Sequence, residues 1–324
     1  MFGEANSVVI GTRGSALALA QAHHVRELLE KAHPRLRFEM KIIKTTGDKK
    51  PELSLGSGAG KGLFTKELES ALLRNRIDLA VHSLKDLPVE LPAGLKLGAV
   101  PRRGPVHDVM ISKTPGGLAG LPPGARVGTS SLRRKVQLLH ARADLQMVEI
   151  RGNIETRLRK LVETPKLDTI ILAGAGLERL GYAPRDGQIH AERLPRSAGY
   201  QDEAGTPLPV LYTENLALDA MLPAVGQGAL GLEIRAADSR IASLVEAVNH
   251  YATFQAVMAE RHFLLALGGG CQVPLGALAT VEENRLHLRA VVFDPDGTGR
   301  RTGDLRGEPR EAAELGARLA ARLK

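Results

Sequence analysis

Short apolar runs alternate with helically spaced apolar residues in the N-terminal part of the chain. The apolar runs predict strands over residues 7–12, 37–45 and 78–82. The helical spacing predicts helices over residues 15–32 and 65–75, with Ser15 and Thr65 as candidate N-caps. Residues 47–62 are polar and glycine-rich, and we expect a long loop there. This alternation is typical of an α/β unit.

A second unit of the same kind follows residues 101–105, where two prolines and a glycine interrupt any regular element. Its apolar runs predict strands over residues 125–129, 145–150 and 169–172. Its amphipathic segments predict helices over residues 131–142, 154–163 and 176–180. Strands and helices that alternate in this way predict a parallel sheet covered by helices. Residues 185–216 are polar, and we expect an irregular surface excursion there.

The C-terminal third changes pattern from α/β to α+β. An apolar strand within residues 222–233 is expected to return to the first sheet, and a long helical region from Ser239 leads to the glycine-rich stretch 267–276. Strands over 275–281 and 285–292, a hairpin over 297–307 and a helix over 308–323 predict a small antiparallel sheet closed by a helix. The length of the chain suits two or three domains, and this last part could stand as a domain of its own.

Charge and aromatic content narrow the class of partner. Lys and Arg number 44 against 36 Asp and Glu, and this net charge of +8 indicates an anionic partner. With no Trp, four Tyr and six Phe, the chain has few stacking platforms for single strands, and it lacks a duplex-binding motif. Small acidic ligands are therefore favoured over nucleic acid, although a basic surface without function is the alternative.

Other classes of site and location are disfavoured by the same sequence. No apolar run approaches the length of a membrane span, and the N-terminus lacks the features of a signal peptide, so we expect a cytoplasmic protein without a membrane partner. The ten histidines show no H-E-x-x-H spacing and there is no paired cysteine, so we expect no metal site.

Basic and hydroxyl side chains recur where a predicted strand ends and a helix begins. Helix N-termini attract anions, and arginine binds carboxylates through two parallel hydrogen bonds, so repeated junctions at one sheet edge predict a cradle for a polyanion. A solvated basic helix face would explain any one junction alone. The junctions of the second unit contain Thr129, Ser131, Arg133 and Arg134, then Arg151 and Arg157, and then Arg179. In the first unit, Arg13 and Ser15 follow the first strand.

Lys85 and Asp86 directly follow the predicted strand 78–82. Ligand sites in open parallel sheets gather at the carboxyl ends of strands, where Asp86 is a candidate acid or base and Lys85 a cation beside it. The alternative is an ordinary surface ion pair.

The only cysteine, Cys271, lies in the stretch L-G-G-G-C-Q-V-P-L-G. A lone thiol cannot form an internal disulfide, and its common role is that of a small buried hydrophobe. The preceding glycines allow unusual backbone angles and close approach by another group, which a core position would not require. We expect the sulfur to be displayed at a corner between a helix and a strand.

Six motifs together resemble the porphobilinogen deaminase family, whose members are also called hydroxymethylbilane synthases. They are G-T-R-G-S-A-L-A-L-A-Q-A, H-S-L-K-D-L-P, G-T-S-S-L-R-R, R-G-N-I-E-T-R, L-P-A-V-G-Q-G-A and G-G-G-C-Q-V-P-L-G, in the family's order, and the match runs from about Val8 to Gly276. The resemblance implies an α/β fold of three domains: two periplasmic-binding-protein-like lobes with mainly parallel sheets, plus a small α+β C-terminal domain. We expect the first lobe over residues 1–100 with 219–238, the second over 101–218, and the C-terminal domain over 239–324. It also implies a monomeric transferase that condenses four porphobilinogen molecules head to tail, with loss of ammonia, into hydroxymethylbilane for heme and porphyrin biosynthesis.

The same resemblance assigns roles to individual residues. It implies one dipyrromethane cofactor per chain, bound to Cys271 through a thioether, and Asp86 as the catalytic residue. Cofactor carboxylates would be bound by Lys85, Thr129, Ser131, Arg133 and Arg134. The substrate and the growing chain would be bound by Arg13, Ser15, Arg151, Arg157 and Arg179. Lys61 and Phe64 would belong to a lid or gate. The rival classes are a non-catalytic anion-binding protein on the same scaffold, which needs neither Cys271 nor Asp86, and a nucleic-acid-binding protein.

Overall fold

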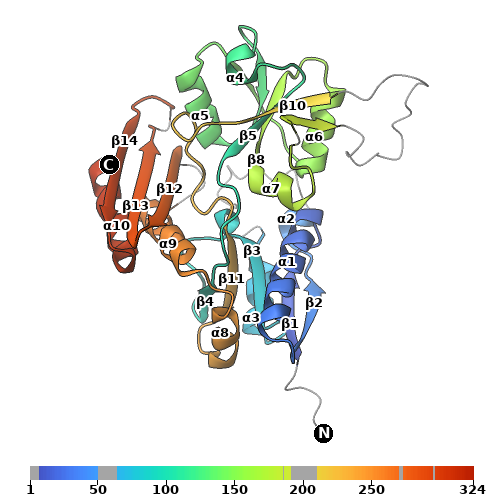
Figure 1. Cartoon of the computed structure of the whole chain (residues 1–324), viewed down its shortest axis with the longest axis vertical. Helices are drawn as coiled ribbons and strands as arrows, with labels where there is room; N and C mark the ends of the chain where they lie inside the picture. The colour runs from blue at the N-terminus through green and yellow to red at the C-terminus, as the bar shows by residue number, and fades with distance from the viewer. Residues whose placement is uncertain (1–6, 50–63, 185, 191–209, 270–272, 295) are drawn as a thin grey trace, which may run out of the picture. The chain divides into compact units, whose positions relative to one another are not determined.

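The computed structural model describes residues 7–49, 64–184, 186–190, 210–269, 273–294 and 296–324 (Figure 1). The chain divides into two compact units, Met1–Pro105 with Ala224–Lys324, and Val106–Pro223. The finer division into three domains stays a prediction. No helix among the described residues is long and apolar enough to cross a membrane.

The first unit contains a five-stranded sheet with the order β2-β1-β3-β11-β4. β1 (Ser7–Thr12) pairs in parallel with β2 (Arg37–Ile42) on one side and with β3 (Leu79–Ser83) on the other. β11 (Leu230–Arg235) runs antiparallel between β3 and β4 (Leu95–Ala99). The predicted return of this late apolar strand to the first sheet is therefore confirmed.

Helices pack on this sheet because each presents an apolar stripe to it. α1 (Ala16–Ala32) and α8 (Ser239–Glu246) bury their apolar positions in one core with β1, β3 and β11. Ser15 caps α1 as predicted, since its hydroxyl accepts a hydrogen bond from the Ala18 amide at 3.3 Å. This cap satisfies one of the amides that a helix N-terminus leaves without a partner inside the helix.

Two local expectations in this unit were wrong. Thr65 precedes α3 (Lys66–Leu73), but it has helical backbone angles and its side chain makes no capping hydrogen bond. The predicted loop 47–62 overlaps a short helix, α2 (Thr46–Lys49), and the remainder of that stretch lies outside the described residues. The glycine-rich composition gave no signal for α2, at whose start the Thr46 amide donates to the Glu67 carboxylate at 2.8 Å.

The C-terminal part of the first unit is a three-stranded antiparallel sheet with two helices. β12 (Leu275–Glu282), β13 (Arg285–Val292) and β14 (Arg301–Gly307) pair in this order. α9 (Tyr251–Ala266) and α10 (Ala312–Leu323) share one apolar core with the sheet. A short 3-10 turn, Pro309–Glu311, forms the first part of the predicted helix 308–323. This part confirms the expected small α+β arrangement.

The second unit contains a six-stranded sheet with the order β7-β6-β8-β5-β10-β9. Its parallel half consists of β7 (Gln146–Val148), β6 (Arg126–Gly128) and β8 (Thr169–Ala173). Its antiparallel half consists of β5 (Asp108–Ser112), β10 (Val210–Asn215) and β9 (Gln188–His190). The helices are α4 (Gly117–Gly120), α5 (Leu132–Ala141), α6 (Ile154–Glu163) and α7 (Gly174–Arg179).

This sheet corrects two sequence-based expectations. β5 was missed, and the flanks of the supposedly irregular stretch 185–216 form β9 and β10. Residues 191–209 lie outside the described residues. The strands escaped prediction because β10 mixes apolar and polar residues, and because it pairs with β5, which lies 100 to 106 residues earlier in the chain.

The two large sheets have a similar arrangement of strands, and this arrangement positions the candidate site residues. In each, a parallel trio is followed by an antiparallel strand from elsewhere in the chain, which is β11 in the first sheet and β5 in the second. The mixed α/β class with parallel-containing sheets is therefore confirmed. Since the strands of each trio are parallel, the segments that follow them gather at one edge of that sheet.

Candidate functional site

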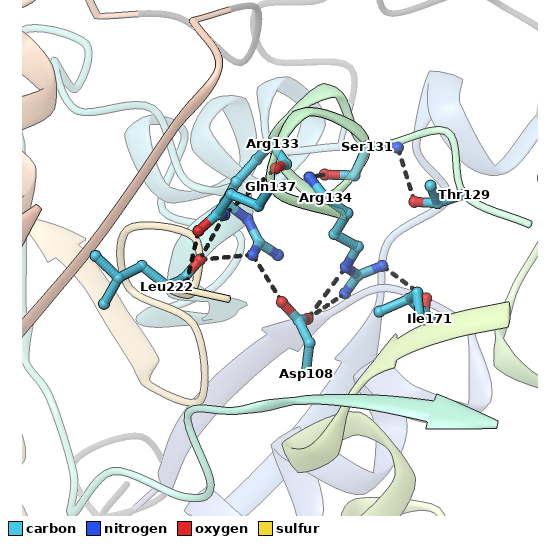
Figure 2. Close-up of polar contacts among 8 residues, drawn as sticks. All are labelled: Asp108, Thr129, Ser131, Arg133, Arg134, Gln137, Ile171 and Leu222. Atoms are coloured by element: carbon cyan, nitrogen blue, oxygen red, sulfur yellow. Dashed lines mark hydrogen bonds and ion pairs between the residues drawn. The ribbon is translucent and has the colours of Figure 1, made fainter. Parts of the chain in front are cut away.

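A buried carboxylate holds two neighbouring arginines at the start of α5 (Figure 2). Asp108, which is 0% exposed, accepts a 2.7 Å hydrogen bond from Arg133 Nη1 on Oδ2. Its Oδ1 accepts bonds from Arg134 Nε at 3.1 Å and from Arg134 Nη2 at 2.7 Å. The Asp108–Arg133–Arg134 cluster, as we call these residues, is therefore built from the first residue of β5 and the first turn of α5.

Backbone carbonyls complete the cluster. Arg133 Nη1 also donates to the Leu222 carbonyl at 2.7 Å, and Arg134 Nη1 donates to the Ile171 carbonyl at 2.8 Å (Figure 2). Arg133 makes its hydrogen bonds to Asp108 and to the Leu222 carbonyl through Nη1, and its Nε and Nη2 groups do not take part in them. The guanidinium groups are thus held in place with donor capacity left in Arg133.

The charges of this cluster do not cancel. Each arginine is 7% exposed, and one carboxylate faces two guanidinium groups, so the trio carries one excess positive charge. Burial raises the pKa of Asp108, but the attraction of Arg133 and Arg134 outweighs it and holds that pKa well below the ordinary range. Burial lowers the pKa of Arg133, while Asp108 opposes this change. Because buried charges are retained only with partners, the excess charge favours an anion nearby.

Hydroxyl groups and amides lie beside these arginines at the helix start. Ser131 caps α5 by accepting a 3.4 Å hydrogen bond from the Arg134 amide. The Thr129 hydroxyl in turn accepts a 3.2 Å bond from the Ser131 amide. Thr129, Ser131, Arg133 and Arg134 are therefore brought together where β6 ends and α5 begins (Figure 2). This set of hydroxyl and guanidinium groups has the donor chemistry that carboxylates require.

The other arginines of the second unit follow the neighbouring strands of its parallel trio. Arg151 follows β7 and pairs with Glu149, its Nε donating at 2.7 Å. Asn153 caps α6, in whose first turn Arg157 lies, by accepting a 2.7 Å bond from the Thr156 amide. Arg179 ends α7 after β8, and burial lowers its pKa to about 10, so it stays a cation at neutral pH. The junctions therefore share the carboxyl edge of β7-β6-β8.

In the first unit, the segment after β1 brings Arg13 onto an aromatic ring. The Arg13 guanidinium carbon lies 4.2 Å from the centroid of the Phe64 ring, which is a cation–π distance. Gly47 lies against the same ring, which a Cβ at this position would overlap. Ser15 is engaged in capping α1. Phe64 is thus seated beside the predicted substrate-binding residue Arg13.

Lys85 and Asp86 form a short 3-10 turn, Leu84–Asp86, at the end of β3. Both side chains are exposed, whereas Leu84 and Leu87 on either side are buried. A hydrogen bond from the Leu84 amide to the Ala229 carbonyl, at 3.0 Å, joins the turn to the segment just before β11. Because β1 and β3 are parallel neighbours, Arg13 and Asp86 follow strands at the same edge of the first sheet. The buried leucines thus anchor a turn that presents a carboxylate and a cation to solvent.

Cys271 and Lys61 lie outside the described residues. The flanks of the cysteine loop agree with the predicted corner, since α9 ends at Ala266 and β12 begins at Leu275. Gly268 and Gly269 have φ values of 96° and 51°, the left-handed region that glycine adopts without strain. The described site residues fall in both compact units, and those at the start of α5 are the ones that the hydrogen bonds bring together.

Sequence reasoning missed several buried acids, of which Asp108 contacts predicted site residues. Asp108 opens the apolar run D-V-M-I-S, and a charged residue at the head of a buried strand is the signal that could have identified it. Glu233 in β11 is 0% exposed, and its Oε2 lies 2.9 Å from Nε2 of His82 in β3. Glu260 in α9 is also 0% exposed and pairs with Arg103 at 2.6 Å. Among the described residues, no group of His, Cys, Asp and Glu side chains could hold a metal ion.

Solved structures resemble the chain only weakly. The methionine-binding protein MetQ gives a TM-score of 0.39 at 12% identity, over 79% of this chain and 93% of that one. An OxyR mutant from Corynebacterium glutamicum gives a TM-score of 0.40 at 15% identity, over 79% and 67% of the two chains. Such scores support no conclusion about ligand or activity.

Comparison of sequences is far more specific. The family model described as "Porphobilinogen deaminase, dipyromethane cofactor binding domain" matches residues 8–243, and that described as "Porphobilinogen deaminase, C-terminal domain" matches residues 254–324. The porphobilinogen deaminase of Carboxydothermus hydrogenoformans is 47% identical over 98% of this chain and 93% of its own length. That of Moorella thermoacetica is 48% identical over 98% and 92%. With both models matching in order and close relatives covering nearly its full length, the chain belongs to the porphobilinogen deaminase family.

Proposed function

We propose that this chain joins four porphobilinogen molecules head to tail, using Asp86 for catalysis and Cys271 to carry the dipyrromethane cofactor. Membership of the family makes it a hydroxymethylbilane synthase, a transferase of tetrapyrrole biosynthesis. The observation that carries the assignment of residues is the Asp108–Arg133–Arg134 cluster, whose excess positive charge suits a ligand rich in carboxylates.

The dipyrromethane cofactor fits the residues at the start of α5. Each pyrrole ring carries an acetate and a propionate, and these acidic groups would be held there by Thr129, Ser131, Arg133 and Arg134. Lys85, in the turn after β3, would also bind them. The cofactor, when bound, supplies the pyrrole terminus to which substrate rings are added. Asp108 contributes by fixing both guanidinium groups before the ligand arrives, which reduces the ordering that binding requires.

The incoming substrate carries the same two acidic groups, so a second set of cations is needed. We assign this set to Arg13, Ser15, Arg151, Arg157 and Arg179. Arg179 is suited to the task because burial lowers its pKa only to about 10, so that it remains charged in a poorly solvated place. Phe64 and Lys61 would form the gate, with the Phe64 ring 4.2 Å from the Arg13 guanidinium.

Asp86 has the properties that the chemistry demands. When ammonia leaves porphobilinogen, positive charge develops on the substrate pyrrole, and an adjacent carboxylate lowers the energy of that charge. The exposed Asp86 side chain would accept a hydrogen bond from the pyrrole N–H and transfer the protons that the substitution releases. Lys85, next in sequence, would bind a ligand carboxylate beside it. We also propose that the protein works as a cytoplasmic monomer, without nucleic acid or membrane.

Intact mass spectrometry in denaturing solvent tests the proposal, because only covalent adducts survive there. We expect a mass excess of two pyrrole units on the parent protein and its loss in Cys271→Ser, which removes the only thiol. If the parent is unmodified, it should gain this mass on incubation with porphobilinogen. A parent that stays unmodified after incubation would instead support the rival class, an anion-binding protein on the same scaffold.

A further inference from the structure

A buried arginine of α9 clamps the chain directly after Asp86. Arg261 Nη1 donates to the Leu87 carbonyl at 3.0 Å, and its Nη2 donates to the carbonyls of Pro88 at 2.6 Å and Val89 at 3.0 Å. The residue is 4% exposed. A guanidinium group is the side chain that can donate to three consecutive carbonyls at once, because its N–H groups point outward in one plane.

The same helix supports the turn through apolar contacts. Leu84 and Leu87, on either side of Lys85 and Asp86, pack in one core cluster with Val257, one helical turn before Arg261. Gly226, at a φ of 72°, approaches so closely that a Cβ there would lie 3.2 Å from the Leu84 carbonyl carbon. The turn therefore packs against α9 and against residues 226–229.

Arg261 links this turn to the helix that precedes the cysteine loop. α9 ends at Ala266, and the chain then passes through Gly268 and Gly269 toward Cys271. Burial lowers the pKa of Arg261 to about 10, and nearby Glu233 opposes the change, so the residue keeps its charge at neutral pH. A charged group is costly to bury, and the three carbonyls are what compensate it here.

We propose that Arg261 is a positioning residue for the reaction, which holds the segment after Asp86 at a set distance from α9. The carboxylate of Asp86 and the helix that leads to Cys271 then move as one body. This inference rests on the proposed function, because it takes Asp86 as the group that contacts the substrate. Arg261 itself acts through the backbone of residues 87–89 and does not touch the substrate.

The test compares Arg261→Gln and Arg261→Lys with a matched control. Arg235 is a partly buried arginine of the first unit that donates to the backbone carbonyls of Leu72 (3.1 Å) and Ile77 (2.7 Å), before β3 begins. It also forms ion pairs with Asp78 and Asp238, which the Gln variant removes as well. Arg235→Gln therefore removes a similar clamp far along the sheet from Asp86. For each variant we would measure cofactor loading by intact mass, kcat and KM for porphobilinogen, and amide hydrogen exchange of the peptide 84–91.

We expect Arg261→Gln to load cofactor, to lose about tenfold in kcat with less than about a threefold change in KM, and to exchange the Leu84 and Leu87 amides faster. Arg261→Lys, which keeps the charge and some donors, should recover part of both losses. Arg235→Gln should change exchange near residues 72–78 and leave kcat within about twofold of the parent.

Parental kcat in Arg261→Gln would overturn the inference, as would an effect confined to KM or unchanged exchange over 84–91. A Lys variant as slow as the Gln variant would also contradict it, as would an equal kcat loss in Arg235→Gln. If Arg261→Gln fails to fold, the Lys variant and the control still decide the matter. Failure of the proposed function would look different, since the parent itself would then lack both adduct and turnover.

Discussion

Replacing Asp108 with Asn removes the one charge that faces two buried arginines, at almost constant shape. In the parent, the carboxylate receives hydrogen bonds from Arg133 Nη1 and from Nε and Nη2 of Arg134, at 2.7 to 3.1 Å. Asn offers a single acceptor oxygen and turns an NH2 group toward a guanidinium group. The variant must therefore keep two cations buried with no anion supplied by the chain at this position.

The expected cost follows from the contacts that remain. Breaking a buried ion pair by removing one partner costs about 3–5 kcal/mol. Arg133 and Arg134 keep their bonds to the Leu222 and Ile171 carbonyls, so we place the cost for Asp108→Asn at the lower end, about 3 kcal/mol. With a urea m-value of about 2 kcal/mol/M for a unit of this size, the unfolding midpoint should fall by about 1.5 M.

The assay is urea unfolding of the cofactor-free protein followed by circular dichroism, since the chain has no Trp for fluorescence. Amide hydrogen exchange over β8 assigns the loss to the second unit. Asp144→Asn is the matched control, because Asp144 accepts similar paired bonds from Arg142 Nε and Nη2, both 2.8 Å, at the surface. Solvent screens that exposed pair, so the control midpoint should stay near that of the parent.

The pH dependence of this difference has a definite sign. The attraction of the arginines outweighs burial and lowers the pKa of Asp108 in the folded state. Its contribution to stability is therefore fully present above the unfolded Asp value of about 3.9 and is lost as pH falls toward the lower folded value. The gap between the parent and Asp108→Asn should be constant above about pH 5 and should narrow below about pH 4. Equal midpoints at pH 7, or a gap that widens on acidification, would refute this account of the cluster.

Two further predictions concern the turn that carries Asp86. Asp86→Ala should fold with parental stability, because the side chain is exposed, and should lose about 100-fold or more in kcat when assayed with porphobilinogen; substantial turnover in this variant would remove Asp86 from its assigned role. Gly226→Ala should cost about 1–2 kcal/mol in urea unfolding, because Ala is strained at a φ of 72°. It should also reduce kcat, since the new Cβ would press on the Leu84 carbonyl carbon at 3.2 Å. Gly94→Ala, with a similar φ of 88° but only the flexible Leu73 side chain nearby, should be destabilised without loss of kcat, and equal activity losses in both variants would contradict this reasoning.

Much of the local structure could be predicted because its signals are local. The helix Ile154–Glu163 has the predicted bounds, since Asn153 caps it and its apolar residues recur at helical spacing. The strand Arg285–Val292 also has its predicted bounds, because it combines β-branched and apolar residues with a turn before it. That the junctions after β6, β7 and β8 lie at one sheet edge followed from strand-helix alternation, which predicts parallel strands.

The sequence by itself determined the family, the elements of the parallel trios and the residue types at their carboxyl ends, because motifs and periodicity are properties of neighbouring residues. Only the tertiary structure decided that Arg133 and Arg134 share the buried Asp108, and that Arg261 holds the carbonyls after Asp86. Those partners lie 25, 26 and 173 residues apart along the chain. No periodicity in a single sequence reports such pairings, because they depend on how β5 and α9 pack against elements that are distant in the chain.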